Sequence, residues 1–131
     1  FASIAALHRG MSNIVETSGE AKQLALINAH PELAGKAAVR GELTAESTRE
    51  QSGAGLDQCT QEEFEKLQRL NAAYREKFGF PFILAVRGYD RRGIIANFEA
   101  RVNHSRADEL RASLDQIYRI ARLRLDALLD A

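Results

Sequence analysis

The chain has 131 residues, and its 18 Lys and Arg balance its 18 Asp and Glu, so the formal net charge is zero. This length fits one domain with a buried core, while a neutral charge argues against a dedicated nucleic-acid-binding protein, which needs a basic face. No apolar run is long enough to span a membrane, and a single cysteine, Cys59, excludes an internal disulfide and predicts a reducing, cytoplasmic location.

The first 60 residues predict three helices separated by breaks. Apolar residues at helical spacing indicate a first helix that begins after Ser3 and ends at Gly19. A second, short helix ends near His30, because the following proline disfavours helical geometry in the residue before it. Residues 31–41 are predicted to be irregular, and a third helix is expected from Thr44 to about Ser52.

The middle of the chain predicts a long helix followed by an extended segment. Thr60 and Glu63 form a capping box at the start of this helix, and Gly79 ends it. The next seven residues, 80–86, form an apolar run that is too short for a full helix. Pro81 excludes a central position in a sheet, so we expect this run to be extended chain.

The last third predicts a turn over residues 87–93 and a helix from Ile94 to Val102. Ser105 and Asp108 then cap a final helix. Its apolar stripe consists of Leu110, Leu114, Ile117, Ala121, Leu125 and Leu128.

These elements predict an all-α fold: a single compact helical domain of about six to eight helices, with a short extended segment near Phe80–Val86. The domain is expected to cover residues 1–131. Because the sequence opens at Phe1 within an amphipathic pattern, we expect this chain to lack a native N-terminal helical segment.

Arg124 is predicted to point toward the protein. At 100° per residue, with Leu110 at zero, the apolar arc of the last helix ends near 340° and Arg124 falls at about 320°. Arg119 and Arg122 fall at about 180° and 120°, toward water. A buried guanidinium needs a carboxylate or an anionic ligand. Arg124 therefore either forms an internal salt bridge or binds a substrate carboxylate.

Two further polar features are candidates for a site. Ser47, Glu50 and Gln51 share one helix face, which is either solvated or lines a cleft where it could read a small polar heterocycle. His30 ends a helix, where it is either a simple cap or a proton-transfer group. One cysteine and three scattered histidines fit no familiar zinc spacing, so no metal site is predicted.

Five sequence blocks together resemble the family of 2-oxo-4-hydroxy-4-carboxy-5-ureidoimidazoline (OHCU) decarboxylases, which act in urate breakdown. The resemblance covers nearly the whole chain. In order, the blocks are His30-Pro-Glu-Leu-Ala-Gly-Lys36, Ser47-x-x-Glu50-Gln51-x-x-Ala54-Gly55-Leu56, Leu70-Asn71-x-x-Tyr74, Lys77-Phe-Gly-Phe-Pro-Phe-Ile83 and Ile120-Ala-Arg-Leu-Arg124-Leu125.

The resemblance implies an all-helical homodimer that needs no cofactor and converts its small-molecule substrate, OHCU, to (S)-allantoin and CO2. It also implies a further N-terminal helical segment before the position of Phe1. His30, Glu50 and Arg124 are the implied catalytic residues. The implied substrate-binding residues are Pro31, Ser47, Thr48, Arg49 and Gln51, together with the segment Phe82, Ile83, Leu84, Ala85 and Val86, which would bind through its backbone.

The chemistry of this substrate suits these residues. The carbon that carries the carboxylate adjoins a C=N carbon, so the electron pair released with CO2 can flow into the imine without a cofactor. His30 would supply a proton. Glu50 would either orient His30 or bind the ureido group, and Arg124 would hold either the substrate carboxylate or the charge of Glu50.

Two other functions compete with this interpretation. A non-catalytic helical protein-interaction module predicts an exposed apolar groove and no convergence of His30, Glu50 and Arg124. A helical hydrolase of a related ureide would need an activated water, which a metal commonly supplies, and the missing ligand spacing argues against it.

Overall fold

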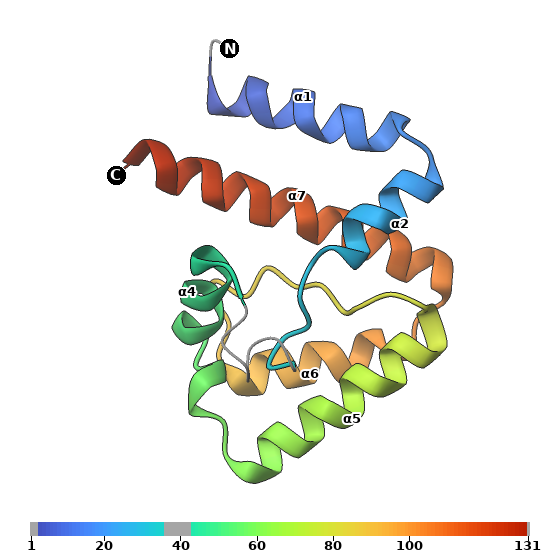
Figure 1. The fold of residues 1–131 in the computed structure, drawn as a ribbon, viewed down its shortest axis with the longest axis vertical. Coiled ribbons are helices and arrows are strands. Elements are labelled where there is room, and N and C mark those ends of the chain that lie inside the picture. Colours follow the sequence, from blue (N-terminus) through green and yellow to red (C-terminus); the bar gives the residue numbers. More distant parts are fainter. Residues whose placement is uncertain (1–2, 36–42, 131) are drawn as a thin grey trace.

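The computed structural model describes residues 3–35 and 43–130, and in these ranges it contains six α-helices, one short 3-10 helix and no strand (Figure 1). The all-α prediction is confirmed. The elements are α1 (Ile4–Thr17), α2 (Glu20–Asn28), α4 (Ala45–Gly53), η1 (Leu56–Gln58), α5 (Gln61–Phe78), α6 (Arg91–Arg101) and α7 (Arg106–Asp130).

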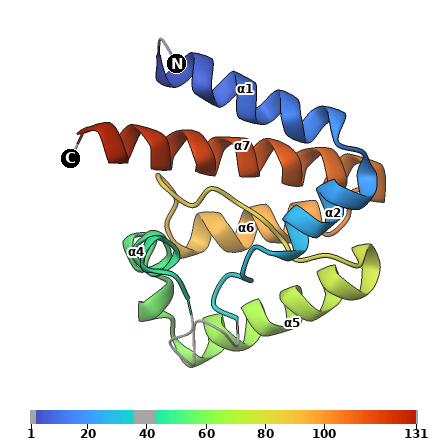
Figure 2. The same cartoon turned by 45° about the horizontal axis from the view of Figure 1, so that its top comes forward.

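The long helix α7 lies at the centre of the arrangement. Helix α1 runs along one side of it, and α6 and α5 lie on the opposite side, while α4 lies at the end of the molecule toward the C-terminus (Figures 1 and 2). Helix α2 packs against both α1 and α7. Within the described ranges, no helix is both long and apolar enough to cross a membrane.

Side-chain caps fix the helix starts much as the sequence indicates. Ser3, Thr44 and Thr60 each accept a hydrogen bond from the backbone N–H three residues on, and Thr60 completes its capping box with Glu63. Gly79, with φ of 82°, ends α5.

Three expected boundaries need adjustment. The turn predicted over 87–93 is too long, because Asp90 accepts a hydrogen bond from the N–H of Gly93 and so starts α6 at Arg91. Helix α1 ends at Thr17, and Gly19, with φ of 90°, instead precedes α2. Most of the irregular segment predicted over 31–41 lies outside the described residues.

The extended segment 80–86 runs through the core, between α6 and α7 (Figure 2). All seven of its residues are buried. Phe80 and Phe82 pack edge-on against Tyr74 of α5, and Phe82 stacks on Phe98 of α6 with ring centroids 3.9 Å apart. This packing brings a stretch of non-helical backbone beside α7, where its N–H and C=O groups need polar partners.

Candidate functional site

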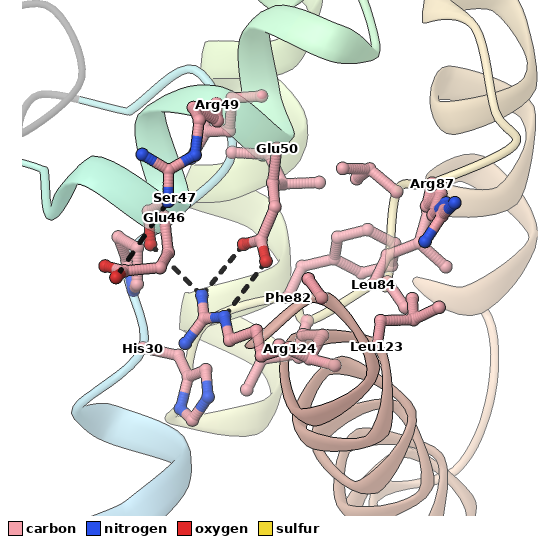
Figure 3. A pocket seen from close by; sticks show the side chains of 18 of the residues that line it. His30, Glu46, Ser47, Arg49, Glu50, Phe82, Leu84, Arg87, Leu123 and Arg124 are labelled. Atoms are coloured by element: carbon pink, nitrogen blue, oxygen red, sulfur yellow. Dashed lines mark hydrogen bonds and ion pairs between the residues drawn. The ribbon is translucent and has the colours of Figure 1, made fainter. Parts of the chain in front are cut away.

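A cavity of about 520 Å³ lies where α4, the extended segment, the chain after α2 and the last third of α7 meet (Figure 3). Nearly all the residues that the sequence singled out line this one cavity. They are His30, Pro31, Ser47, Arg49, Glu50, Gln51, Phe82, Ile83, Leu84, Ala85, Val86 and Arg124.

Thr48 is the exception among the expected site residues. It is exposed and lines a second cavity, of about 480 Å³, on another face of α4. Successive residues of a helix are rotated by about 100°, so Thr48 points away from the face that carries Ser47. Thr48 therefore does not line the first cavity, and of the other candidates only Gln51, which borders both cavities, shares the second one with it.

Arg124 and Glu50 form a bidentate ion pair across the cavity, although 74 residues separate them in sequence. Arg124 Nε donates to Glu50 Oε2 at 2.9 Å and Nη2 donates to Oε1 at 2.8 Å, while Ser47 Oγ lies 3.5 Å from Nη2. These hydrogen bonds, donated to the Glu50 carboxylate, raise the pKa of Arg124. The predicted inward orientation of Arg124 is confirmed, and Arg119 is exposed as expected.

His30 is oriented by the backbone of α2, the helix that precedes it. Its Nδ1 lies 2.9 Å from the carbonyl oxygen of Leu26. Because a carbonyl only accepts hydrogen bonds, Nδ1 carries a proton and Nε2 is the nitrogen left for other chemistry. Both carboxylate oxygens of Glu50 accept from Arg124. The Leu26 carbonyl, rather than Glu50, is therefore the group that orients His30.

Gln51 fixes the turn that follows His30 and Pro31. Its Oε1 accepts from the N–H of Ala34 at 3.0 Å, and its Nε2 lies 3.4 Å from the carbonyl of Glu32. Ala34 has a positive φ of 50°, and its carbonyl accepts from Gln68 Nε2 at 2.6 Å. These bonds give the turn after His30 a defined conformation, which sets one wall of the cavity.

The extended segment presents part of its backbone to the cavity. The N–H of Ala85 donates to Gln116 Oε1 at 2.9 Å, and the carbonyl of Ile83 accepts from Arg101 at 2.6 Å. Among the described residues, Ala85 is the one member of 82–86 whose N–H has a hydrogen-bond partner, and the N–H groups of Leu84 and Val86 are among those without one. These two donors can therefore bind an acceptor on a ligand.

Sequence reasoning missed one apolar wall of the cavity and two charged residues, Glu46 and Arg87. A signal for the wall was present, because Ile120, Leu123 and Ala127 form a second apolar stripe beside Arg124. Arg87 follows the extended segment directly, and Figure 3 shows it on the side of the cavity away from His30.

No group of three or more His, Cys, Asp or Glu side chains is placed to bind a metal ion in residues 3–35 and 43–130.

Comparison with known proteins assigns the chain to a family. Residues 1–126 match the family model described as OHCU decarboxylase. The chain is 43% identical over 125 residues to the 2-oxo-4-hydroxy-4-carboxy-5-ureidoimidazoline decarboxylase of Haloferax volcanii, which covers 95% of this chain and 72% of that protein.

Two crystal structures share the fold. An (S)-allantoin synthase is 31% identical, with a TM-score of 0.75 over 97% of this chain and 38% of the synthase chain. An OHCU decarboxylase solved in the presence of (S)-allantoin is 20% identical, with a TM-score of 0.80 over all of this chain and 84% of that one.

Proposed function

This chain belongs to the OHCU decarboxylase family, and on that premise we propose that it converts OHCU to (S)-allantoin and CO2 without a cofactor. One observation carries the proposal. His30, the Glu50–Arg124 pair and the extended segment Phe82–Val86 all line one cavity, although they come from four separate parts of the chain.

The reaction needs a path for one electron pair and one proton. When the bond between the ring carbon and the carboxylate breaks, its electrons form a C=C bond to the neighbouring carbon, and the C=N electrons move onto nitrogen. The nitrogen takes up a proton, and the enol that results becomes a carbonyl when its hydroxyl proton leaves and a proton reaches the ureido-bearing carbon, so that one proton is consumed overall. The face that receives this proton sets the configuration of allantoin.

His30 is the proposed proton donor. Its Nδ1–H is engaged by Leu26, so the proton that reaches the substrate is carried on Nε2. Because the ring is fixed by this hydrogen bond, Nε2 addresses one side of the cavity only. A single fixed donor accounts for a single product configuration.

Arg124 is the proposed contact for the substrate carboxylate, and Glu50 weakens the attraction of Arg124 for that carboxylate. Glu50 engages Nε and Nη2, which leaves Nη1 as the nitrogen that faces a ligand. A free guanidinium would bind the carboxylate tightly in the ground state, and such binding alone does not accelerate the loss of CO2. The paired Glu50 reduces that ground-state attraction.

The remaining polar groups are proposed to bind the ring and the ureido group of the substrate. The N–H groups of Leu84 and Val86 would donate to a ring oxygen at no side-chain entropy cost. Ser47 and Arg49 face the same cavity from α4 and would bind the ureido end. Pro31 and Gln51 would act mainly by shaping the wall after His30.

A non-catalytic interaction module is the weaker candidate. It predicts an apolar groove without convergent polar groups, whereas here a bidentate ion pair and a histidine share the cavity. The apolar walls of the cavity are what an enclosed small-molecule site also requires.

We also propose that the protein is a homodimer in a reducing compartment such as the cytoplasm. Cys59 is a free thiol, and burial, its largest influence, raises its pKa. Because the thiolate is the reactive form, this shift makes Cys59 less reactive toward oxidants. Sedimentation measurements would test the dimer.

Circular dichroism tests the activity directly. OHCU is generated from urate by a urate oxidase and a hydrolase, and the signal of (S)-allantoin is followed with and without this protein. We expect rapid, stereospecific formation with the wild type and at least about a hundredfold slower formation with His30→Asn. A folded wild type without acceleration, or a His30→Asn variant within tenfold of it, would contradict the proposal.

A further inference from the structure

The extended segment is fixed to the scaffold at two adjacent points on one edge. Arg101, at the end of α6, donates from Nη1 to the carbonyl of Ile83 at 2.6 Å. Gln116, on α7, accepts from the N–H of Ala85 through Oε1 at 2.9 Å. Neither Arg101 nor Gln116 lines the cavity.

The spacing of these two bonds decides which backbone groups face a ligand. In extended chain, the N–H and C=O of one residue point to the same edge, and those of the next residue point to the opposite edge. Bonds at Ile83 and Ala85 therefore occupy one edge. The N–H groups of Leu84 and Val86, which have no partner among the described residues, lie on the other.

Arg101 is itself fixed by buried neighbours. It is 7% exposed, its Nε lies 2.9 Å from Oε1 of the fully buried Glu109, and its guanidinium lies over the ring of Phe82 at 4.4 Å from the centroid. The hydroxyl of Tyr74 donates to the same carboxylate oxygen of Glu109. Arg101 therefore fixes both the Phe82 ring and the next carbonyl in the chain.

We propose that Arg101 and Gln116 are positioning residues for the reaction: they fix the edge of the extended segment that turns the N–H groups of Leu84 and Val86 toward the substrate. This inference rests on the proposed function. The substrate acceptors it concerns are the oxygens of a cyclic amide, which need donors at fixed positions.

The sharpest test replaces Gln116, because it is only partly buried and carries no charge. Gln116→Leu removes the acceptor for Ala85, whereas Gln116→Glu keeps an oxygen in its place. Gln23→Leu is the matched control: it removes another glutamine hydrogen bond to the backbone, from Nε2 to the carbonyl of Val15 at 3.0 Å, away from the cavity.

Steady-state kinetics and hydrogen exchange of residues 82–86 provide two independent readouts. We expect Gln116→Leu to raise KM about tenfold and to speed exchange of the segment by a similar factor, while Gln116→Glu and Gln23→Leu stay within about threefold of the wild type. Arg101→Lys, which keeps a charge for Glu109 but loses the donor to Ile83, should also raise KM. An apolar residue at this position would leave Glu109 buried and unpaired, so it is not the variant of choice.

The outcomes separate the two proposals. Equal KM and equal exchange in Gln116→Leu and Gln23→Leu would overturn the positioning role, as would a Gln116→Glu variant as impaired as Gln116→Leu. A wild type that does not decarboxylate OHCU would contradict the proposed function. In that case, the exchange measurement would still decide whether Gln116 fixes the segment.

Discussion

At the scale of single residues, the pair between Arg124 and Glu50 depends on the shape of the guanidinium as well as its charge. Two parallel hydrogen bonds join the groups, at 2.9 and 2.8 Å, and both side chains remain about one-third exposed. At that exposure the charge attraction is screened by water. The geometric match, which sets where the remaining amino group points, is therefore the property that matters for a ligand.

Arg124→Lys tests this geometry. A lysine keeps the positive charge but cannot bind Glu50 through two parallel bonds and still present a nitrogen to the substrate. We expect kcat/KM to fall by roughly ten- to a hundredfold with unchanged helical content. Arg122→Lys is the control, because Arg122 pairs with Asp126 at 3.2 Å and does not line the cavity. Equal losses in the two variants would contradict a geometric role for Arg124.

At the scale of elements, the corner between α6 and α7 is built on a buried ion pair. Arg101 ends α6 and Glu109 lies in the first turn of α7, so each charge also suits the helix dipole at its position. The carboxylate of Glu109 further accepts from Tyr74 and bonds to His104 Nδ1 at 3.0 Å. Burial, followed by this hydrogen bond to Glu109, raises the pKa of Tyr74, so the phenol keeps its proton.

Removing one member of this buried pair should lower the free energy of unfolding far more than breaking a surface pair does. Arg101→Met is expected to lower the free energy of unfolding by roughly 3–5 kcal/mol, because Glu109 would stay buried without its counter-ion. Arg106→Met breaks the exposed pair of Arg106 with Glu20, at 3.4 Å, and should cost less than about 1 kcal/mol. Urea unfolding of both variants measures the difference, and similar costs would contradict this account.

Helix α1 is joined to α7 by polar contacts at its far end. Arg111 donates to both oxygens of Glu16, and the hydroxyl of Tyr118 donates to Oε2. The hydrogen bond from Arg111, and then that from Tyr118, lower the pKa of Glu16 below its ordinary 4.5. Burial and the hydrogen bond to Glu16 raise the pKa of Tyr118 to about 12.

The lowered pKa of Glu16 gives a pH dependence of known sign. Between the folded and unfolded pKa values the unfolded chain binds more protons, so the stabilisation is complete above about pH 4.5 and is lost as the pH falls through the folded pKa. Glu16→Gln removes this contribution. We expect wild type and variant to differ in urea unfolding near neutral pH and to converge once the pH falls below the folded pKa of Glu16. A difference that persists unchanged in acid would rule out this ionisation as its source.

The helices themselves could be predicted because their signals are local. The capping box at Thr60 and the left-handed Gly79 delimit α5 as expected. Asp90 was missed as a cap because the glycine it serves, Gly93, suggested a turn. The polar segment 87–93 fits either a turn or the start of a helix. The choice depends on whether the residues after it are buried, which the local sequence does not give.

At the scale of the whole molecule, the site combines residues that only tertiary packing brings together. Helical periodicity placed Arg124 on the inner face, but its partner lies 74 residues away, and no spacing rule connects them. The orienting role of the Leu26 carbonyl was equally inaccessible, because a backbone group leaves no mark in a sequence. The side chains that anchor the extended segment, Arg101 and Gln116, lie 18 and 31 residues from the backbone groups that they bind, and no spacing rule connects them either. Resemblance to a family supplied the candidate site residues that periodicity could not.

Because the cavity exists only in the folded chain, a ligand that fits it must stabilise the whole molecule by mass action. At ten times its Kd, the product (S)-allantoin should add about 1.4 kcal/mol to the free energy of unfolding, and the Tm should rise accordingly. The enantiomer, (R)-allantoin, should add much less, because the proposed reaction requires the ring to meet His30 and the N–H groups of Leu84 and Val86 from one side only, and all three residues line the cavity. In Arg119→Lys, altered on the exposed face of α7, the shift should persist; in Arg124→Lys it should shrink. Equal shifts with both enantiomers would mean that allantoin binds without the stereochemical contacts that the proposed reaction requires.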